Sequence, residues 1–275
     1  MGRRSSESSL TKTMARSPSG PPPPPAVQKL RLRYAKRGRL RFSSHRDFQR
    51  ALERALRRAG VPMAYSAGFT PHPKISYANA APTGTASEAE YVELSVTSRV
   101  DPLALREALD RSLPPGLDIL EVVEAAPGAL ADRLEASDWE LVLPGVLAQA
   151  LEAAVAALLK RDAVDVQRLM KTGLRTFDAR GPIVLAEVVA PTAARSESGR
   201  AAVAAGVGCA ILRVVVRHTT PAVRPDDVLA ALRVVADLVP LSPAQVTRLA
   251  QGPLEAAGAV ADPLAAADHG GDARG

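Results

Sequence analysis

The clearest pattern in the sequence is a stretch of helical periodicity that follows Ser44. Asp47 stands three positions after Ser44, and this pairing satisfies free backbone amides at the start of a helix. Gly60 suits the left-handed residue that ends a helix, and Pro62 prevents its continuation. The apolar residues recur every three or four positions and form one face: Phe48, Ala51, Leu52, Ala55, Leu56 and Ala59. We therefore predict an amphipathic helix that begins after Ser44 and ends at Gly60.

Alternating apolar and polar residues on both sides of this helix indicate strands. Leu30, Leu32 and Tyr34 alternate with basic residues, so one side of that strand is apolar and the other is cationic. Asp101 followed by Pro102 predicts the start of a second helix, which runs to about residue 113. Further strands are predicted over 63–66, 75–78, 90–97 and 117–123. The resulting order, strand-helix-strand-strand-helix-strand, is that of a ferredoxin-like unit over residues 27–126.

The second half of the chain repeats this pattern in outline. Strands are predicted over 139–143, 163–170, 183–189 and 208–218, with a less regular one over 174–177. Helices are predicted over 146–159 and 225–238, and a short terminal helix is predicted to begin at Ser242 and Pro243. Residues 190–206, rich in small side chains, suggest a mobile insertion. We therefore predict an α+β protein of two tandem ferredoxin-like units, the second over 138–251.

The two ends of the chain have the composition of disordered tails. Residues 1–26 are mostly Ser, Arg and Pro, and residues 252–275 are mostly Ala, Gly and Asp. No apolar run approaches the roughly 20 residues of a membrane-spanning helix, and the N-terminal segment lacks the apolar stretch of a signal peptide. Cys209 is the only cysteine, so no internal disulfide is expected. These features predict a cytoplasmic protein that does not enter the membrane.

Positive charge is concentrated in one segment. Residues 29–58 contain twelve Lys or Arg against Asp47 and Glu53, a surplus of ten, whereas the whole chain of 275 residues carries only +6. The remainder is therefore net acidic. Four arginines fall on the polar face of the predicted helix, about one per turn: Arg46, Arg50, Arg54 and Arg57. Segregated charge of this kind favours a polyanion partner, although a solvated helix face that pairs with Glu53 also fits.

A proline-rich loop over 68–74 follows the helix. Pro71 and Pro73 bracket His72 and restrict the backbone around it, while Lys74 adds a cation and Phe69 a ring that can stack on a base. The alternative interpretation is a turn whose histidine is merely exposed. We predict that Phe69, His72 and Lys74 join the four arginines in binding RNA.

The run SSHRDFQRALERALRRAGVPMAYSAGFTPHPKISYANAAPTGTASEAEY resembles the radical-SAM-associated domain family of unknown function. The resemblance covers about residues 27–123, and the second half is similar only around 168–171 and 177–180. In that family the domain is fused behind a radical-SAM enzyme or encoded separately. This chain lacks the three clustered cysteines that hold a radical-SAM cluster. The resemblance therefore implies a stand-alone accessory domain with a radical-SAM enzyme as a possible partner.

Other motifs that carry chemistry are absent from the sequence. It has no phosphate-binding glycine loop of the nucleotide-binding types, and its histidines and cysteine are too few for a zinc site. We accordingly expect no cofactor and no metal, and a binding protein rather than an enzyme. Three functions remain: an RNA-binding adaptor that serves a modifying enzyme, a metal-independent ribonuclease that uses His45 and His72 as base and acid, and a module that docks an acidic protein.

Overall fold

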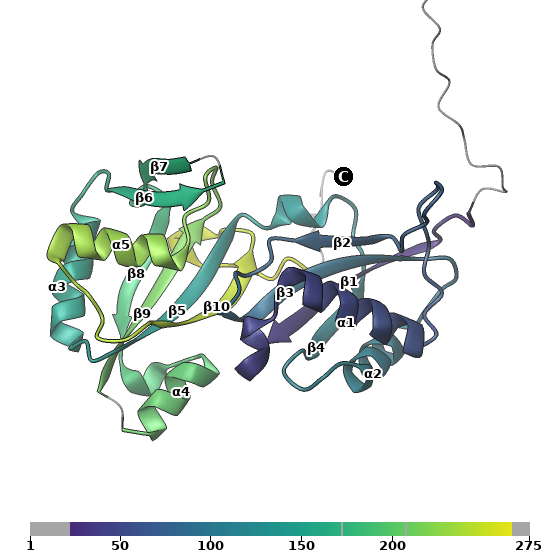
Figure 1. Cartoon of the computed structure of the whole chain (residues 1–275), viewed down its shortest axis with the longest axis horizontal. Coiled ribbons are helices and arrows are strands. Elements are labelled where there is room, and N and C mark those ends of the chain that lie inside the picture. The colour runs from purple at the N-terminus through teal and green to yellow at the C-terminus, as the bar shows by residue number, and fades with distance from the viewer. Residues whose placement is uncertain (1–22, 172, 207, 266–275) are drawn as a thin grey trace, which may run out of the picture.

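The protein folds around one continuous mixed sheet with helices packed mainly on one side (Figure 1). The computed structural model describes residues 23–171, 173–206 and 208–265. Most of the predicted N-terminal tail and the last ten residues of the predicted C-terminal tail lie outside this range. The order of the main strands is β4-β1-β3-β10-β5-β9-β8, and β2 pairs with β3. The α+β class predicted from the sequence is confirmed.

The first half contains four strands and two helices in the predicted order. Its elements are β1 (Gln28–Lys36), α1 (His45–Arg58), β2 (Ile75–Ala78), β3 (Ala86–Val96), α2 (Pro102–Ser112) and β4 (Ile119–Glu124), with the short 3-10 helix η1 (Gly38–Phe42) before α1. The strands lie in the order β4-β1-β3-β2 and every pair is antiparallel. This is the arrangement of a split βαβ unit. The predicted strand over 63–66 makes only two isolated bridges, Met63 to Val96 and Tyr65 to Pro73.

The start of α1 follows the capping box predicted from the sequence. The backbone amide of Asp47 donates to Ser44 Oγ at 3.2 Å, and the amide of Ser44 donates to Asp47 Oδ2 at 3.1 Å. Gly60 has φ +64°, the left-handed geometry expected just after the helix. Phe48, Leu52, Ala55 and Leu56 are buried against the sheet. The apolar periodicity therefore determines which face of α1 is left to solvent.

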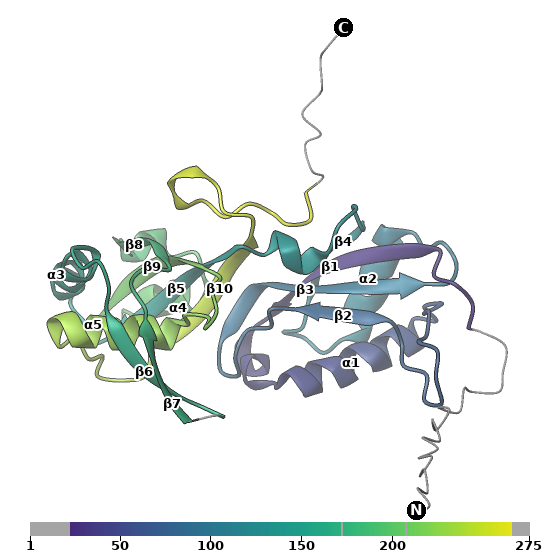
Figure 2. The same cartoon turned by 90° about the horizontal axis from the view of Figure 1, so that it is seen from above.

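The second half repeats the arrangement with two insertions. Its elements are β5 (Ala136–Pro144), α3 (Ala148–Leu159), β6 (Asp165–Met170), β7 (Gly173–Asp178), β8 (Ile183–Val189), α4 (Glu197–Ala204), β9 (Cys209–Arg217), α5 (Pro225–Ala236) and β10 (Gln245–Gly252). The sheet strands lie in the order β10-β5-β9-β8, all antiparallel. The β6–β7 pair forms a separate ribbon that projects from this half (Figure 2), and α4 is the other insertion.

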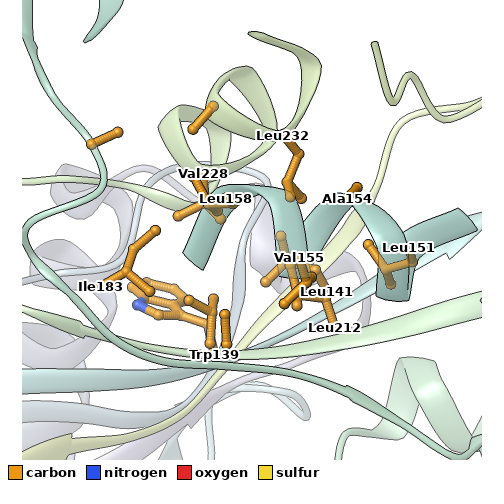
Figure 3. Packing of buried hydrophobic residues seen from close by; sticks show 14 of the residues in the cluster. Trp139, Leu141, Leu151, Ala154, Val155, Leu158, Ile183, Leu212, Val228 and Leu232 are labelled. Atoms are coloured by element: carbon orange, nitrogen blue, oxygen red, sulfur yellow. The ribbon is translucent and has the colours of Figure 1, made fainter. Parts of the chain in front are cut away.

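The core of the second half lies between the sheet and the pair α3 and α5. Trp139 and Leu141 come from β5 and Leu212 from β9, and all are buried. Figure 3 shows the helix side chains that pack against them: Leu151, Ala154, Val155, Leu158, Val228 and Leu232. Both halves therefore place their helix pair on a sheet, and each has its own apolar core.

A short parallel contact joins the two halves into one sheet. Thr247 of β10 pairs with Ala86 of β3, and Arg248 pairs with Ser87. This strand replaces the terminal helix predicted from Ser242 and Pro243, which is wrong. The start signal for a helix is local, whereas β10 forms because strands on both of its sides satisfy its backbone.

Two further predictions about the second half need correction. Residues 190–206, predicted to be a mobile insertion, contain α4, in which Ala202 packs on Val142 and Ile211. Residues 253–265, predicted as disordered tail, are placed: Leu254 bridges to Val260, and Leu264 is buried in a cluster that includes Tyr91. Both segments are ordered by packing on the sheet face opposite the main helices, which the composition does not show.

Candidate nucleic-acid interface

The four arginines of α1 lie on its solvent face. Arg46, Arg50, Arg54 and Arg57 are all exposed, and within the described residues none of them forms an ion pair. Glu53, the candidate partner in the alternative interpretation, does not pair with them. From the first to the last of these residues the helix rises about 17 Å, so the guanidinium groups form a row of that length. We call these four residues the arginine stripe.

The basic residues of β1 differ from the arginine stripe because carboxylates neutralise them. Lys29 and Arg31 share Glu93, at 3.1 and 3.0 Å, and Arg33 contacts Glu121 at 3.3 Å. Arg37, just after β1, pairs with both Glu88 and Asp118. Lys36 is buried and donates to the carbonyls of Ala81 and Pro82, and burial lowers its pKa. The charge surplus read from the sequence is therefore smaller at the surface, where it is concentrated on α1.

Hydrogen bonds close the loop over 68–74 beside the C-terminal half of α1. The amide of His72 donates to Ser66 Oγ at 3.0 Å, the amide of Ser66 donates to the His72 carbonyl at 2.8 Å, and the amide of Lys74 donates to the Ala64 carbonyl at 2.7 Å. Phe69 is 73% exposed at the tip, and the side chains of His72 and Lys74 are exposed too. The loop therefore holds its polar side chains outward on a closed backbone.

The structure brings His72 to the arginine stripe but does not bring it to His45. A pocket of about 250 Å³ is lined by His72, Arg57 and Glu53, among others. His45 lies at the opposite end of α1, where its ring meets Tyr77 edge-on at 4.9 Å. Eight residues of helix separate His45 from Glu53, a rise of about 12 Å. An acid and a base that serve one phosphate must both reach it by hydrogen bonds, so this arrangement gives the ribonuclease interpretation no support.

A second, larger pocket lies between the two halves, and the sequence interpretation missed it. It has a volume of about 440 Å³, with Asn79 from the first half and Ser137, His218 and Arg248 from the second among its lining residues. The His218 ring lies 2.8 Å from Ser137 Oγ through Nε2, and 2.7 Å from the Leu134 carbonyl through Nδ1. Burial is the main reason that the pKa of His218 is lowered. No sequence motif marks this pocket, because its residues come from distant segments.

One lining residue of the pocket, Arg248, belongs to a buried ion pair. Arg248 of β10 contacts Glu90 of β3, with side-chain exposures of 4% and 2%. Burial by itself would raise the pKa of Glu90, but Arg248 and hydrogen bonds, including one from the Ala81 amide, lower it below its ordinary value. The Arg248 guanidinium also lies over the Trp139 ring, 5.2 Å from its centre. This contact links β3, β10 and β5, and therefore the two halves.

Neither a metal site nor a membrane span is found in the part of the chain that the structure describes. No three His, Cys, Asp or Glu side chains there form a group that can hold a metal ion. Among the helices of those residues, none has the length and apolar character needed to cross a bilayer.

Comparison with known proteins identifies a family for the chain but supplies no activity. No curated protein matches the chain. Residues 29–225, which include α1, the loop over 68–74 and most of the second half, match one family. The chain belongs to that family, which is described as "Uncharacterized protein conserved in bacteria (DUF2344)".

Proposed function

We propose that this protein binds RNA through the arginine stripe and the loop over 68–74, and presents it to a modifying enzyme. The observation that carries the proposal is a row of four exposed guanidinium groups that no carboxylate of the described residues neutralises. An uncompensated row of cations binds phosphates with the release of condensed counterions. A protein that kept these residues only for solubility would gain from pairing them along the helix, and Glu53 is placed for that without doing so.

Recognition of a single strand needs a surface on which bases stack as well as cations that contact phosphates, and the loop over 68–74 supplies that surface. Phe69 offers an exposed ring on which a base can stack, an interaction worth about 1–3 kcal/mol per base. Lys74 and His72 lie on the same loop, and His72 shares a pocket with Arg57. Phosphate contacts along α1 and a stacked base at the loop tip are compatible with one strand that passes over both. This combination favours single-stranded RNA over an acidic protein surface.

The partner enzyme in this proposal is a radical-SAM enzyme. Support for it comes from the resemblance of the α1 and loop segment to radical-SAM-associated domains. This chain has only Cys209 and so does not hold a three-cysteine cluster by itself. The chemistry would therefore be performed by a separate chain in the cytoplasm, while this protein holds the RNA.

The experiment is the salt dependence of RNA binding by the full chain. A variant with Arg46, Arg50, Arg54 and Arg57 all replaced by Gln is compared with the parent by fluorescence anisotropy on a labelled single-stranded RNA. Each lost phosphate contact should reduce the slope of log affinity against log salt by about 0.7, so four should flatten it by up to about 3.

A matched control separates the position of the charges from their number. Replacing Arg99, Arg111, Arg161 and Arg233 by Gln removes the same net charge from exposed positions off α1. This control should keep a slope close to that of the parent. Equal slopes for the parent and the arginine-stripe variant, or no RNA binding by the parent, would refute the proposal.

A further inference from the structure

The pocket between the two halves is lined by two arginines, one with a carboxylate partner and one without such a partner among the described residues. Its buried cation, Arg248, is compensated by Glu90. Arg224, at the start of α5, is exposed and forms no ion pair within the described residues. The remaining walls are largely apolar and include Trp139, the one tryptophan of the chain. A volume of about 440 Å³ falls in the range of small-molecule sites. The pocket therefore suits a neutral group that forms hydrogen bonds and carries an anion at its outer end.

The hydrogen bonds of His218 determine which kind of group fits. Its Nδ1 lies 2.7 Å from the Leu134 carbonyl, which only accepts, so Nδ1 carries the proton. In the neutral ring Nε2 then accepts the hydroxyl proton of Ser137, at 2.8 Å. Thr219 Oγ1 similarly donates to the Pro221 carbonyl at 2.9 Å. The hydroxyls of Ser137 and Thr219 therefore both donate to groups of the protein, so toward a ligand each hydroxyl oxygen can only accept a hydrogen bond. A matching ligand must donate, as an amino group does.

The pocket lies near the first turn of α1, where the arginine stripe begins. Asn79 lies two residues after Tyr77, and the Tyr77 ring contacts His45 in the first turn of α1. Two residues of extended chain span about 7 Å. The Asn79 carboxamide belongs to the pocket lining, with 3.3 Å between its Nδ2 and His218 Nδ1. Both nitrogens carry hydrogens in this tautomer, so they do not bond to each other, and the amide keeps a donor and an acceptor for a ligand. The pocket therefore lies toward the N-terminal end of α1, the end at which the arginine stripe begins with Arg46.

We propose that this pocket binds one unpaired, amino-bearing nucleobase (adenine, cytosine or guanine) with its phosphate toward Arg224. The proposal rests on the RNA binding proposed above, and names a base-specific subsite within it. Ser137 and Thr219 accept from the exocyclic amino group, and Asn79 pairs with the neighbouring edge of the base. Uracil has a carbonyl where cytosine has its amino group, so its carbonyl oxygen would face the hydroxyl oxygens of Ser137 and Thr219, and no hydrogen bond could form. The pocket therefore discriminates by hydrogen-bond direction.

Trp139 provides the measurement, because it is the only tryptophan in the chain and it lines the pocket. Its fluorescence is followed while the full chain is titrated with cytidine monophosphate, uridine monophosphate or ribose 5-phosphate, and free tryptophan amide is titrated alongside to correct for absorption by the base. Cytidine monophosphate should give a saturable change with an affinity at least about fivefold above that of uridine monophosphate, since an unpaired buried acceptor is costly. Ribose phosphate should give none.

Two variants test the assigned contacts. Ser137→Ala should remove the preference for cytidine over uridine. Asn79→Gly, which keeps the left-handed backbone of this exposed residue (φ +43°), should weaken the binding of both nucleotides. The arginine-stripe variant should retain the response to cytidine monophosphate, so the two proposals fail separately. The nucleobase proposal is overturned by an absent response, by equal affinities for the two nucleotides in the parent, or by a preference that survives in Ser137→Ala. Stripe-dependent RNA binding would stand in each of those cases.

Discussion

The buried pair Arg248 and Glu90 allows a quantitative prediction about how the two halves are held together. Glu90→Gln keeps the shape of the side chain but removes its charge, and the guanidinium of Arg248 remains buried with a side-chain exposure of 4%. Removing one partner of a buried pair typically costs about 3–5 kcal/mol, since the other charge is left without compensation. Glu90 also accepts from the Ala81 amide at 3.0 Å, and a glutamine oxygen can still do so. We therefore expect a loss near the lower end of that range.

The assay is urea unfolding followed by circular dichroism at neutral pH. Glu124→Gln is the matched control, because Glu124 and Arg99 form the same kind of pair at 3.5 Å with side chains 55% and 76% exposed. Such exposed pairs contribute about 0–1 kcal/mol. The double change Glu90→Gln with Arg248→Met should recover much of the loss, since it removes the buried charge altogether. A Glu90→Gln variant no less stable than Glu124→Gln would refute this reasoning.

The pH dependence of the same pair has a definite sign. The pKa of Glu90 is lowered in the folded protein, so the unfolded chain takes up a proton first as the pH falls. The stability that the pair contributes is therefore constant above the ordinary pKa of 4.5 and is lost as the pH falls through the lowered value. Glu90→Gln should lack this acid-dependent part of the unfolding free energy.

Three further predictions concern single side chains. Ser44→Ala should lower the free energy of unfolding by about 1 kcal/mol through loss of the cap, and unchanged stability with lost RNA binding would instead place Ser44 in the site. His72→Ala should weaken RNA binding by the full chain in fluorescence anisotropy without lowering the free energy of unfolding, because His72 is exposed on the loop and shares a pocket with Arg57. An affinity equal to that of the parent would remove His72 from the interface. Because burial lowers the pKa of His218 from 6.5, the unfolded chain binds the proton first, so stability should fall as the pH drops below about 6.5. His218→Gln should flatten that decline in urea unfolding, and an unaltered decline would contradict it.

Elements whose signals are local could be predicted from the order of residues. The cap at Ser44, the apolar spacing after it and the left-handed Gly60 lie within one stretch, so α1 and its solvent face follow from neighbouring residues. The order of strands and helices in the first half follows in the same way, because strand alternation and helix starts are read a few residues at a time. The arginine stripe was predicted for this reason, as was the exposure of the loop over 68–74.

The charges that remain free and the position of the second pocket depend on contacts between distant segments, which the order of residues does not show. Arg31 and Arg37 are neutralised by Glu93 and Glu88, carboxylates more than fifty residues away, so no reading of the local charge count separates them from the arginine stripe. The partners of β10 are equally remote, and Ser137 meets His218 across 81 residues. Pairing between strands depends on which backbone groups the fold brings side by side. The packing of the whole sheet determines which strands pair with β10. The local pattern of residues 242–252 does not identify those partners.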